Sequence, residues 1–197
     1  MAPIATSPAD ESDEELMRRL AAGDSAALTP LVRRHQERVV RLARRFLGRT
    51  DLAEDVAQDA FVKVYQSAGR YRPEARFTTW LYRLVANLCW DRRRGLSRAR
   101  RRDREHGHAD TAPDAAAAIE ADERSERVRA ALASLPDRQR LAVILHRYHE
   151  LSHKDIAAVT GWSVSAVESC LVRAYETLRN RLADLIDVPP DHGEPRR

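Results

Sequence analysis

Apolar side chains recur at intervals of three and four residues along most of the chain, which is the periodicity of an α-helix. The clearest series is Leu31, His35, Val39, Leu42 and Phe46. It marks one face of a long helix that the glycine after Leu47 would end. No segment alternates apolar and polar side chains between turn residues, as a half-buried strand does. The spacing therefore predicts an all-α fold.

The periodic segments form two groups, separated by a stretch rich in Asp, Ala and His. In the first group we expect a helix opened by a capping box of Ser12 and Glu15, the long helix ending at Gly48, a helix from Leu52 to Ala68 closed by Gly69, and a helix from about Thr78 onward. In the second group we expect helices around Val128–Leu135 and from Pro136 to Tyr148, then two shorter ones flanking Thr160–Ser163.

These groups give a chain of two small helical domains joined by a flexible linker. The expected parts are an acidic disordered tail at 1–11, a helical bundle at 12–102, an acidic linker at 103–124, a helix-turn-helix domain at 125–187 and a disordered tail at 188–197.

Charge lies in blocks that the formal net charge of +4 conceals. Residues 10–15 carry five acids, 92–104 carry eight arginines and one acid, and 105–127 carry seven acids and two arginines. All but two of the 34 basic residues are arginine, an excess that a GC-rich genome would also produce. Blocks of opposite sign are informative about binding partners rather than about fold.

Membrane and secreted proteins are excluded by other features. No apolar run approaches the roughly 18 residues of a membrane helix, and the acidic start lacks the apolar segment of a secretory signal. Cys89 and Cys170 give no disulfide framework and fit a reducing compartment. We expect a cytoplasmic protein with no direct membrane insertion.

The segment from Lys154 to Val172 fits a helix-turn-helix, with Ile156 in the core and Gly161 at the tight turn. In this motif the second helix enters the DNA major groove, its first residues nearest the bases. The residues expected to contact duplex DNA are Ser163, Val164, Ser165, Glu168, Ser169 and Arg173. By itself this pattern also fits an ordinary helical hairpin. Glu168 would be unfavourable near phosphates unless it accepts a hydrogen bond from a cytosine amine.

The segment His149–His153 matches the HExxH signature of zinc hydrolases. That chemistry needs both histidines on one face of a continuous helix. Leu151 and Ser152 lie where one helix should end and the next begin, and no convincing third ligand follows. We therefore expect no catalytic residue, no metal site and no cofactor, with a zinc hydrolase as the alternative.

Seven of the eleven aromatic residues lie between Phe61 and Trp90, beside the arginine block. Single-stranded nucleic acid needs aromatic rings for stacking, cations for the backbone and polar groups for unpaired base edges. The residues expected to contact it are Phe77, Thr78, Thr79, Trp80, Arg83 and Asn87. The alternative for Trp80 and Tyr82 is packing in the core.

A polar stripe precedes this cluster at helical spacing, opposite the apolar face. It comprises Asp51, Glu54, Asp55, Gln58 and Asp59. Such a stripe is usually a solvated face. Because its charge repels phosphate, its position beside DNA-binding segments favours contact with a protein.

Four segments resemble the two-domain bacterial sigma factors of the extracytoplasmic-function type. Residues 51–61 (DLAEDVAQDAF) and 77–87 (FTTWLYRLVAN) resemble parts of sigma region 2. Residues 134–140 (SLPDRQR) and 151–157 (LSHKDIA), with the helix after Gly161, resemble region 4. The resemblance covers roughly 12–102 and 125–185, in the family's order.

The resemblance implies a factor that binds core RNA polymerase and promoter DNA, melts the −10 region and directs initiation in an envelope or stress response. It places the polar stripe, Asp55, Gln58 and Asp59 especially, on the β′ clamp helices, and implies a β flap contact. It assigns Phe77–Trp80 and Asn87 to a flipped −10 base and Ser163–Arg173 to the −35 duplex. It also implies an anti-sigma factor, which would be able to hold the protein at the membrane. The alternative is a stand-alone helix-turn-helix regulator.

Overall fold

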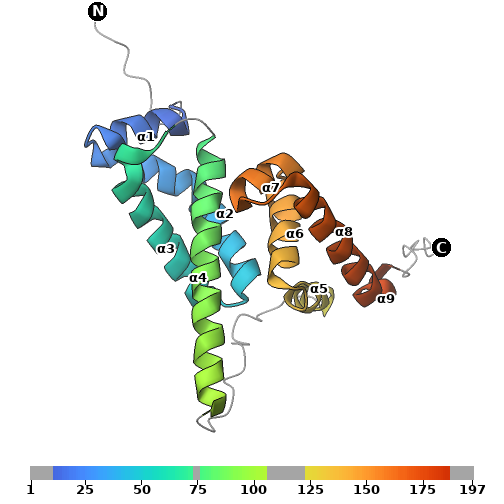
Figure 1. Ribbon diagram of the computed structural model, residues 1–197. Coiled ribbons are helices and arrows are strands. Elements are labelled where there is room, and N and C mark those ends of the chain that lie inside the picture. The colour runs from blue at the N-terminus through green and yellow to red at the C-terminus, as the bar shows by residue number, and fades with distance from the viewer. Residues whose placement is uncertain (1–10, 73–75, 106–122, 187–197) are drawn as a thin grey trace, which may run out of the picture.

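The computed structural model describes residues 11–72, 76–105 and 123–186, and within these ranges the chain is helical without a strand. The helices are α1 (Asp13–Ala21), α2 (Leu28–Leu47), α3 (Thr50–Ser67), α4 (Phe77–Glu105), α5 (Glu123–Ala133), α6 (Asp137–His149), α7 (His153–Thr160), α8 (Val164–Arg181) and α9 (Ala183–Ile186) (Figure 1). The predicted all-α class with two helical groups is confirmed. The two predicted disordered tails and most of the predicted linker lie outside the described residues.

The first unit is a bundle of α1 to α4. The whole predicted stripe of α2 is buried, and the helix ends at Gly48, whose φ of 74° is a left-handed conformation that favours glycine. Only one of the two hydrogen bonds of the capping box expected at α1 forms. Ser12 Oγ accepts a hydrogen bond from the Glu15 backbone, while the Glu15 carboxylate pairs with Arg18.

The end of α3 differs from the prediction. The helix ends at Ser67, and Gly69 lies inside a short 3-10 helix formed by Ala68–Arg70. Its φ is not positive, so Gly69 does not act as the left-handed cap that the sequence indicated. This 3-10 turn carries the chain from α3 toward the start of α4.

The second unit contains α5 to α9. Pro136 precedes the first residue of α6, as predicted, but α8 is a helix of 18 residues rather than a short one. Tyr148, near the end of α6, is 38% exposed, and the Arg45 guanidinium lies 4.1 Å from its ring centre. No single described helix is long and apolar enough to cross a membrane, although α7 and α8, bent by 108°, together meet the criteria of length and composition.

The two units pack directly against each other. In Figure 1 the second unit lies to one side of α4, with α7 beside α4 and α8 and α9 farther out; α6 contacts α2 and α7 contacts α4. The buried apolar side chains of both units form one continuous cluster. Arg93 and Asp137 join the units by two bonds of 3.0 and 3.1 Å. The sequence predicted tethered domains but gave no sign of this contact.

A buried guanidinium lies at the centre of the contact. Arg140 is 3% exposed and donates hydrogen bonds to the carbonyl oxygens of Leu132 and Leu135, both at 3.0 Å, and to that of Ala133. It also donates to the Phe46 carbonyl at 3.1 Å, which belongs to the first unit. Because the last carbonyls of a helix lack intrahelical donors, Arg140 satisfies the ends of both α5 and α2.

We expect Arg140→Ala to lower the free energy of unfolding by about 3 kcal/mol, because several buried carbonyls lose a charged donor. Urea denaturation measures this. Arg129→Ala is the control, since Arg129 is an exposed residue of α5 that pairs with Glu126, and it should cost less than about 0.5 kcal/mol. Equal costs for the two variants would contradict the role given to Arg140.

Candidate nucleic-acid interfaces

An open hollow of about 330 Å³ lies between the 3-10 turn and α4. It is lined by Ser67, Arg70, Tyr71, Trp80, Arg83, Leu84 and Asn87. Three of the residues expected to contact single-stranded DNA, Trp80, Arg83 and Asn87, therefore converge on one site. They do so because they are spaced three and four residues apart on α4. Four further residues line the hollow that the sequence did not indicate, namely Ser67, Arg70, Tyr71 and Leu84. Tyr71 carried a signal, because it is one of the aromatic residues clustered between Phe61 and Trp90.

Phe77 lies beneath this hollow instead of lining it. Its side chain is 1% exposed, and its ring centre lies 5.9 Å from Trp80 and 6.3 Å from Tyr71. The Tyr71 and Trp80 rings meet edge to face at 5.3 Å. The buried Phe77 ring therefore packs against the Tyr71 and Trp80 rings above it and does not line the hollow. Thr78 and Thr79 are half-buried beside it.

Hydrogen-bonding groups surround the aromatic wall. Arg70, Arg83 and Asn87 are exposed, so their polar ends reach the opening. Burial raises the pKa of the Tyr71 hydroxyl, as do the nearby Glu14 and Asp13 carboxylates. The phenol therefore keeps its proton at neutral pH and remains a hydrogen-bond donor. The hollow combines π faces, two cations and an amide.

The arginine block on α4 is partly neutralised within the protein. Arg92 pairs with Asp59 at 2.8 Å, Arg93 pairs with Asp137, and Arg94 pairs with Asp91. Arg98 is exposed and its guanidinium lies by the Arg94 carbonyl. The cationic surface beside the hollow is therefore smaller than the sequence indicated.

The polar stripe lies on the outer face of α3, opposite the buried face of that helix. Asp51, Glu54, Asp55 and Gln58 are exposed and Asp59 is half-buried. Each end of the stripe already has a cationic partner. The Arg49 guanidinium hydrogen-bonds Asp51 and thereby holds its pKa below the ordinary value, and Arg92 binds Asp59. Within the described residues, no ion pair engages Glu54 or Asp55, so the middle of the stripe is available to a partner.

Helices α7 and α8 form a helix-turn-helix with an angle of 108° between them. Ser152 and Asp155 form a reciprocal capping box at the start of α7, Gly161 makes the turn with a φ of 73°, and Ser163 caps α8. Ile156 is fully buried, as the sequence predicted, and Val167 of α8 is fully buried as well.

One side of α8 faces solvent. The residues expected to contact duplex DNA are all exposed there, namely Ser163, Val164, Ser165, Glu168, Ser169 and Arg173. Glu168 lies 3.5 Å from the Nδ1 atom of His153, so a ring of α7 holds the carboxylate. The first turns of α8 otherwise present small hydroxyl side chains, which allow a close approach to another surface.

The histidines of the HExxH segment belong to different helices. α6 ends at His149, Glu150 adopts a left-handed φ of 56°, and α7 begins after Ser152. This confirms the predicted break and removes the continuous helix that a zinc hydrolase needs. His149 Nδ1 lies 3.1 Å from the Tyr82 hydroxyl. Tyr82 is buried, so it follows the alternative of packing in the core.

A second, mainly apolar groove of about 480 Å³ lies between α5 and the end of α8. Its lining includes Val128, Tyr175, Leu178, Leu182 and Leu185. The groove was not predicted from the sequence, although the spacing of the three leucines by four and three residues was a usable signal.

A helix-turn-helix with an exposed face on α8 and a separate hollow of aromatic and cationic groups are the features expected of a protein that binds nucleic acid. Residues 31–99 match the family described as Sigma-70 region 2, and residues 125–178 match Sigma-70, region 4. The chain belongs to the extracytoplasmic-function (ECF) family of RNA polymerase sigma factors. The predicted resemblance is confirmed, and this excludes a stand-alone regulator.

Individual relatives agree with this assignment. The chain is 32% identical to the RNA polymerase sigma-H factor of Pseudomonas aeruginosa, over 89% of this chain and 96% of that one. It is 31% identical to the ECF RNA polymerase sigma-E factor of Escherichia coli K12, over the same shares. It is similar to the structure of CnrH in complex with the cytosolic domain of CnrY, at a TM-score of 0.67 and 29% identity, over 88% of this chain and 99% of that one.

We expect His149 to make the stability of the protein depend on pH. Burial lowers the pKa of His149 to about 4, and Arg45, Arg41 and Arg38 act in the same direction. Within the described residues its Nε2 atom is buried without a hydrogen-bond partner. Folding therefore favours the neutral ring. The contribution of His149 to the free energy of unfolding is complete above pH 6.5 and is lost as the pH falls toward 4. The loss should be roughly 3 kcal/mol.

Urea denaturation at pH 7 and pH 4.5, in wild type and in His149→Asn, measures this contribution. The amide leaves a polar group near the Tyr82 hydroxyl but does not titrate, so the variant should lose less stability between the two pH values. His153→Asn is the matched control, because the side chain of His153 is 41% exposed and pairs with Glu168 at the surface of the motif. Parallel losses in wild type and His149→Asn would contradict the prediction.

Proposed function

We propose that the protein binds core RNA polymerase through its polar stripe, captures an unpaired promoter base in the hollow on α4, and recognises duplex DNA with α8. In this proposal the −10 element occupies the hollow and the −35 element contacts α8. The protein performs no chemical step itself, and acts through binding free energy in the cytoplasm.

The observation that carries the proposal is the convergence of Trp80, Arg83 and Asn87 on one hollow, in a chain of this family. Removing a base from the stack costs a few kcal/mol. Stacking on an aromatic ring contributes about 1–3 kcal/mol per base, and hydrogen bonds to the base edge add to it. Trp80 supplies the ring, Asn87 an amide for a base edge, and Arg83 a charge for the backbone. The hollow thus holds the groups needed to offset unstacking.

For the −35 duplex, support comes from the exposed side of α8 in a helix-turn-helix of suitable angle. Ser163, Val164, Ser165 and Ser169 are small enough to bring the helix close to base edges. Arg173, further along the helix, suits a phosphate. Glu168 fits a cytosine N4 amine, which donates to carboxylates in the major groove.

For the polymerase, support comes from the exposed acids in the middle of the stripe, Glu54 and Asp55, with Gln58 beside them. We assign the β′ clamp helices to this face of α3 and the β flap to the apolar groove at α5 and α8. The similar chain CnrH was solved in complex with the cytosolic domain of a second protein. This supports an anti-sigma factor as a further partner, one that would mask both units.

We expect Trp80→Ala to reduce promoter-specific transcription by core RNA polymerase about tenfold to a hundredfold, because a stacking contact is lost. Trp80→Phe keeps an aromatic face and should retain most activity. Asn87→Ala should reduce transcription about tenfold and relax the preference for one base. The measurement is in vitro transcription on a library of fragmented bacterial genomic DNA, with transcripts sequenced.

Asn180→Ala, an exposed amide at the far end of α8, is the matched control and should transcribe like wild type. Binding of each variant to core polymerase is measured in parallel and should not change. Wild-type protein that supports no promoter-specific initiation would overturn the proposed function. Full activity of Trp80→Ala would show that the hollow has no part in the proposed function.

A further inference from the structure

The first turn of α4, which carries Phe77 and Trp80, is capped by a residue distant in sequence. The Phe77 backbone N–H donates to Glu14 Oε1 at 3.0 Å, across 63 residues. The first N–H groups of a helix have no intrahelical acceptor, and Arg76, just before α4, has no side-chain oxygen to serve as a cap. A carboxylate at this position also interacts favourably with the helix dipole. Glu14, on α1, thus supplies the hydrogen-bond acceptor that the sequence just before α4 lacks.

The neighbouring acid, Asp13, holds the ring that packs on Phe77. Its Oδ2 atom lies 2.7 Å from His35 Nε2, and the His35 ring centre lies 5.3 Å from that of Phe77. Burial acts to raise the pKa of Asp13, but hydrogen bonds from His35 and Arg34 hold it below its ordinary value. Asp13 is therefore ionised at neutral pH and fixes the orientation of the His35 ring.

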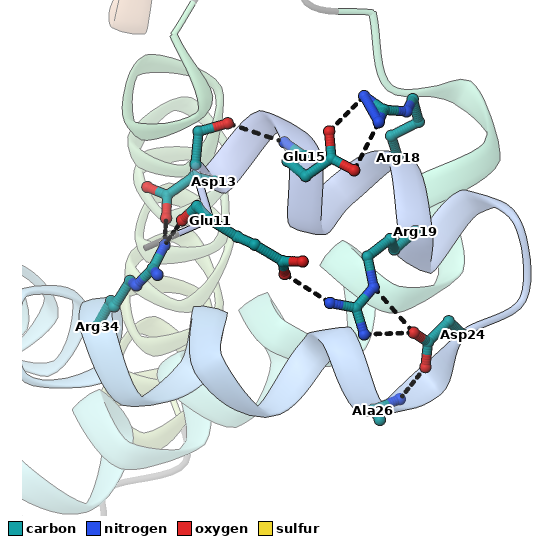
Figure 2. A network of polar contacts seen from close by, with 9 residues as sticks. Glu11, Asp13, Glu15, Arg18, Arg19, Asp24, Ala26 and Arg34 are labelled. Carbon is teal, nitrogen blue, oxygen red and sulfur yellow. Dashed lines mark hydrogen bonds and ion pairs between the residues drawn. The ribbon is translucent and has the colours of Figure 1, made fainter. Parts of the chain in front are cut away.

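α1 is itself held firmly in place, so it can position other groups. Its buried side chains are Leu16, Met17 and Leu20. Figure 2 shows the polar contacts around it, in which Arg34 bonds to both the Glu11 carbonyl and Asp13, and Arg19 joins Glu11 to Asp24. These bonds connect the start of α1 to α2 and to the turn that follows α1. The two acids therefore project from a fixed helix.

We propose that Glu14 and Asp13 are positioning residues for DNA capture. Glu14 fixes the backbone of the first turn of α4, and Asp13 acts through His35 on Phe77, so that Tyr71 and Trp80 above it keep their edge-to-face arrangement. The proposal rests on the proposed function, in which the hollow holds an unpaired base. It extends the DNA-capture unit to α1, which lies before the residues that match Sigma-70 region 2.

The test uses full-length protein bound to core polymerase. The probes are fluorescent single-stranded oligonucleotides from both strands of the melted segment of the most active template. We expect Glu14→Ala to weaken binding of the preferred strand about tenfold, the effect of losing one charge-assisted hydrogen bond. Glu14→Gln keeps an oxygen acceptor and should lose only about threefold. Asp13→Asn, which removes the charge facing His35, should lie between them.

Glu15→Ala is the matched control, because Glu15 is the next residue of the same helix and its carboxylate pairs with Arg18 at the surface. It should bind like wild type. Val64→Ala, a core change on α3, controls for stability, since it should destabilise the fold without weakening binding. Circular dichroism confirms that each variant is folded at the assay temperature.

Trp80→Ala separates the two proposals. If Trp80→Ala binds the probe as tightly as wild type, the hollow is not the DNA site and the proposed function fails. If Trp80→Ala weakens binding but Glu14→Ala and Asp13→Asn match Glu15→Ala, the positioning role is overturned and the proposed function stands. Binding weakened by Glu14→Ala and partly restored in Glu14→Gln supports the positioning role.

Discussion

The arrangement of the two helical units depends on one buried guanidinium. Arg140 donates to the carbonyl oxygens of Leu132 and Ala133 at the end of α5 and to that of Phe46 at the end of α2, 94 residues away in sequence. A charge in such a place is tolerated because each of its three nitrogens donates to a backbone carbonyl and the Asp137 carboxylate lies 3.8 Å away. The same residue that completes the second unit therefore also fixes where that unit lies on the first.

Helix α4 connects this contact to the DNA-binding groups, because its faces have different neighbours. Leu81 and Val85 are buried in the core, Tyr82 meets His149 of the second unit, and Arg83 and Asn87 face the hollow. A single helix thus contributes residues to the core, to the contact between the units and to the hollow. Its first turn is held from α1, so the geometry of the hollow depends on contacts that are remote in sequence.

Local patterns predicted the features that depend on neighbouring residues. The spacing on α2 identified its buried face, and Gly161 and Ser163 identified the turn of the helix-turn-helix, because periodicity and capping are properties of short segments. The contacts between distant segments could not be predicted in this way. Arg140 is one arginine in an arginine-rich chain, and its acceptors are backbone carbonyls that carry no sequence signal. Glu14 looked like one of a run of exposed acids at the start of the first helix, and Phe77 looked like a stacking platform.

The central claim is that the hollow holds an unpaired promoter base when the protein is bound to polymerase. The most direct measurement places a photoreactive amino acid at Leu84, which lines the hollow, and maps its crosslinks to promoter DNA. We predict crosslinks within the melted segment of one strand, formed only when core polymerase is present. Crosslinks to duplex DNA without polymerase, or none in an active initiation complex, would contradict the claim.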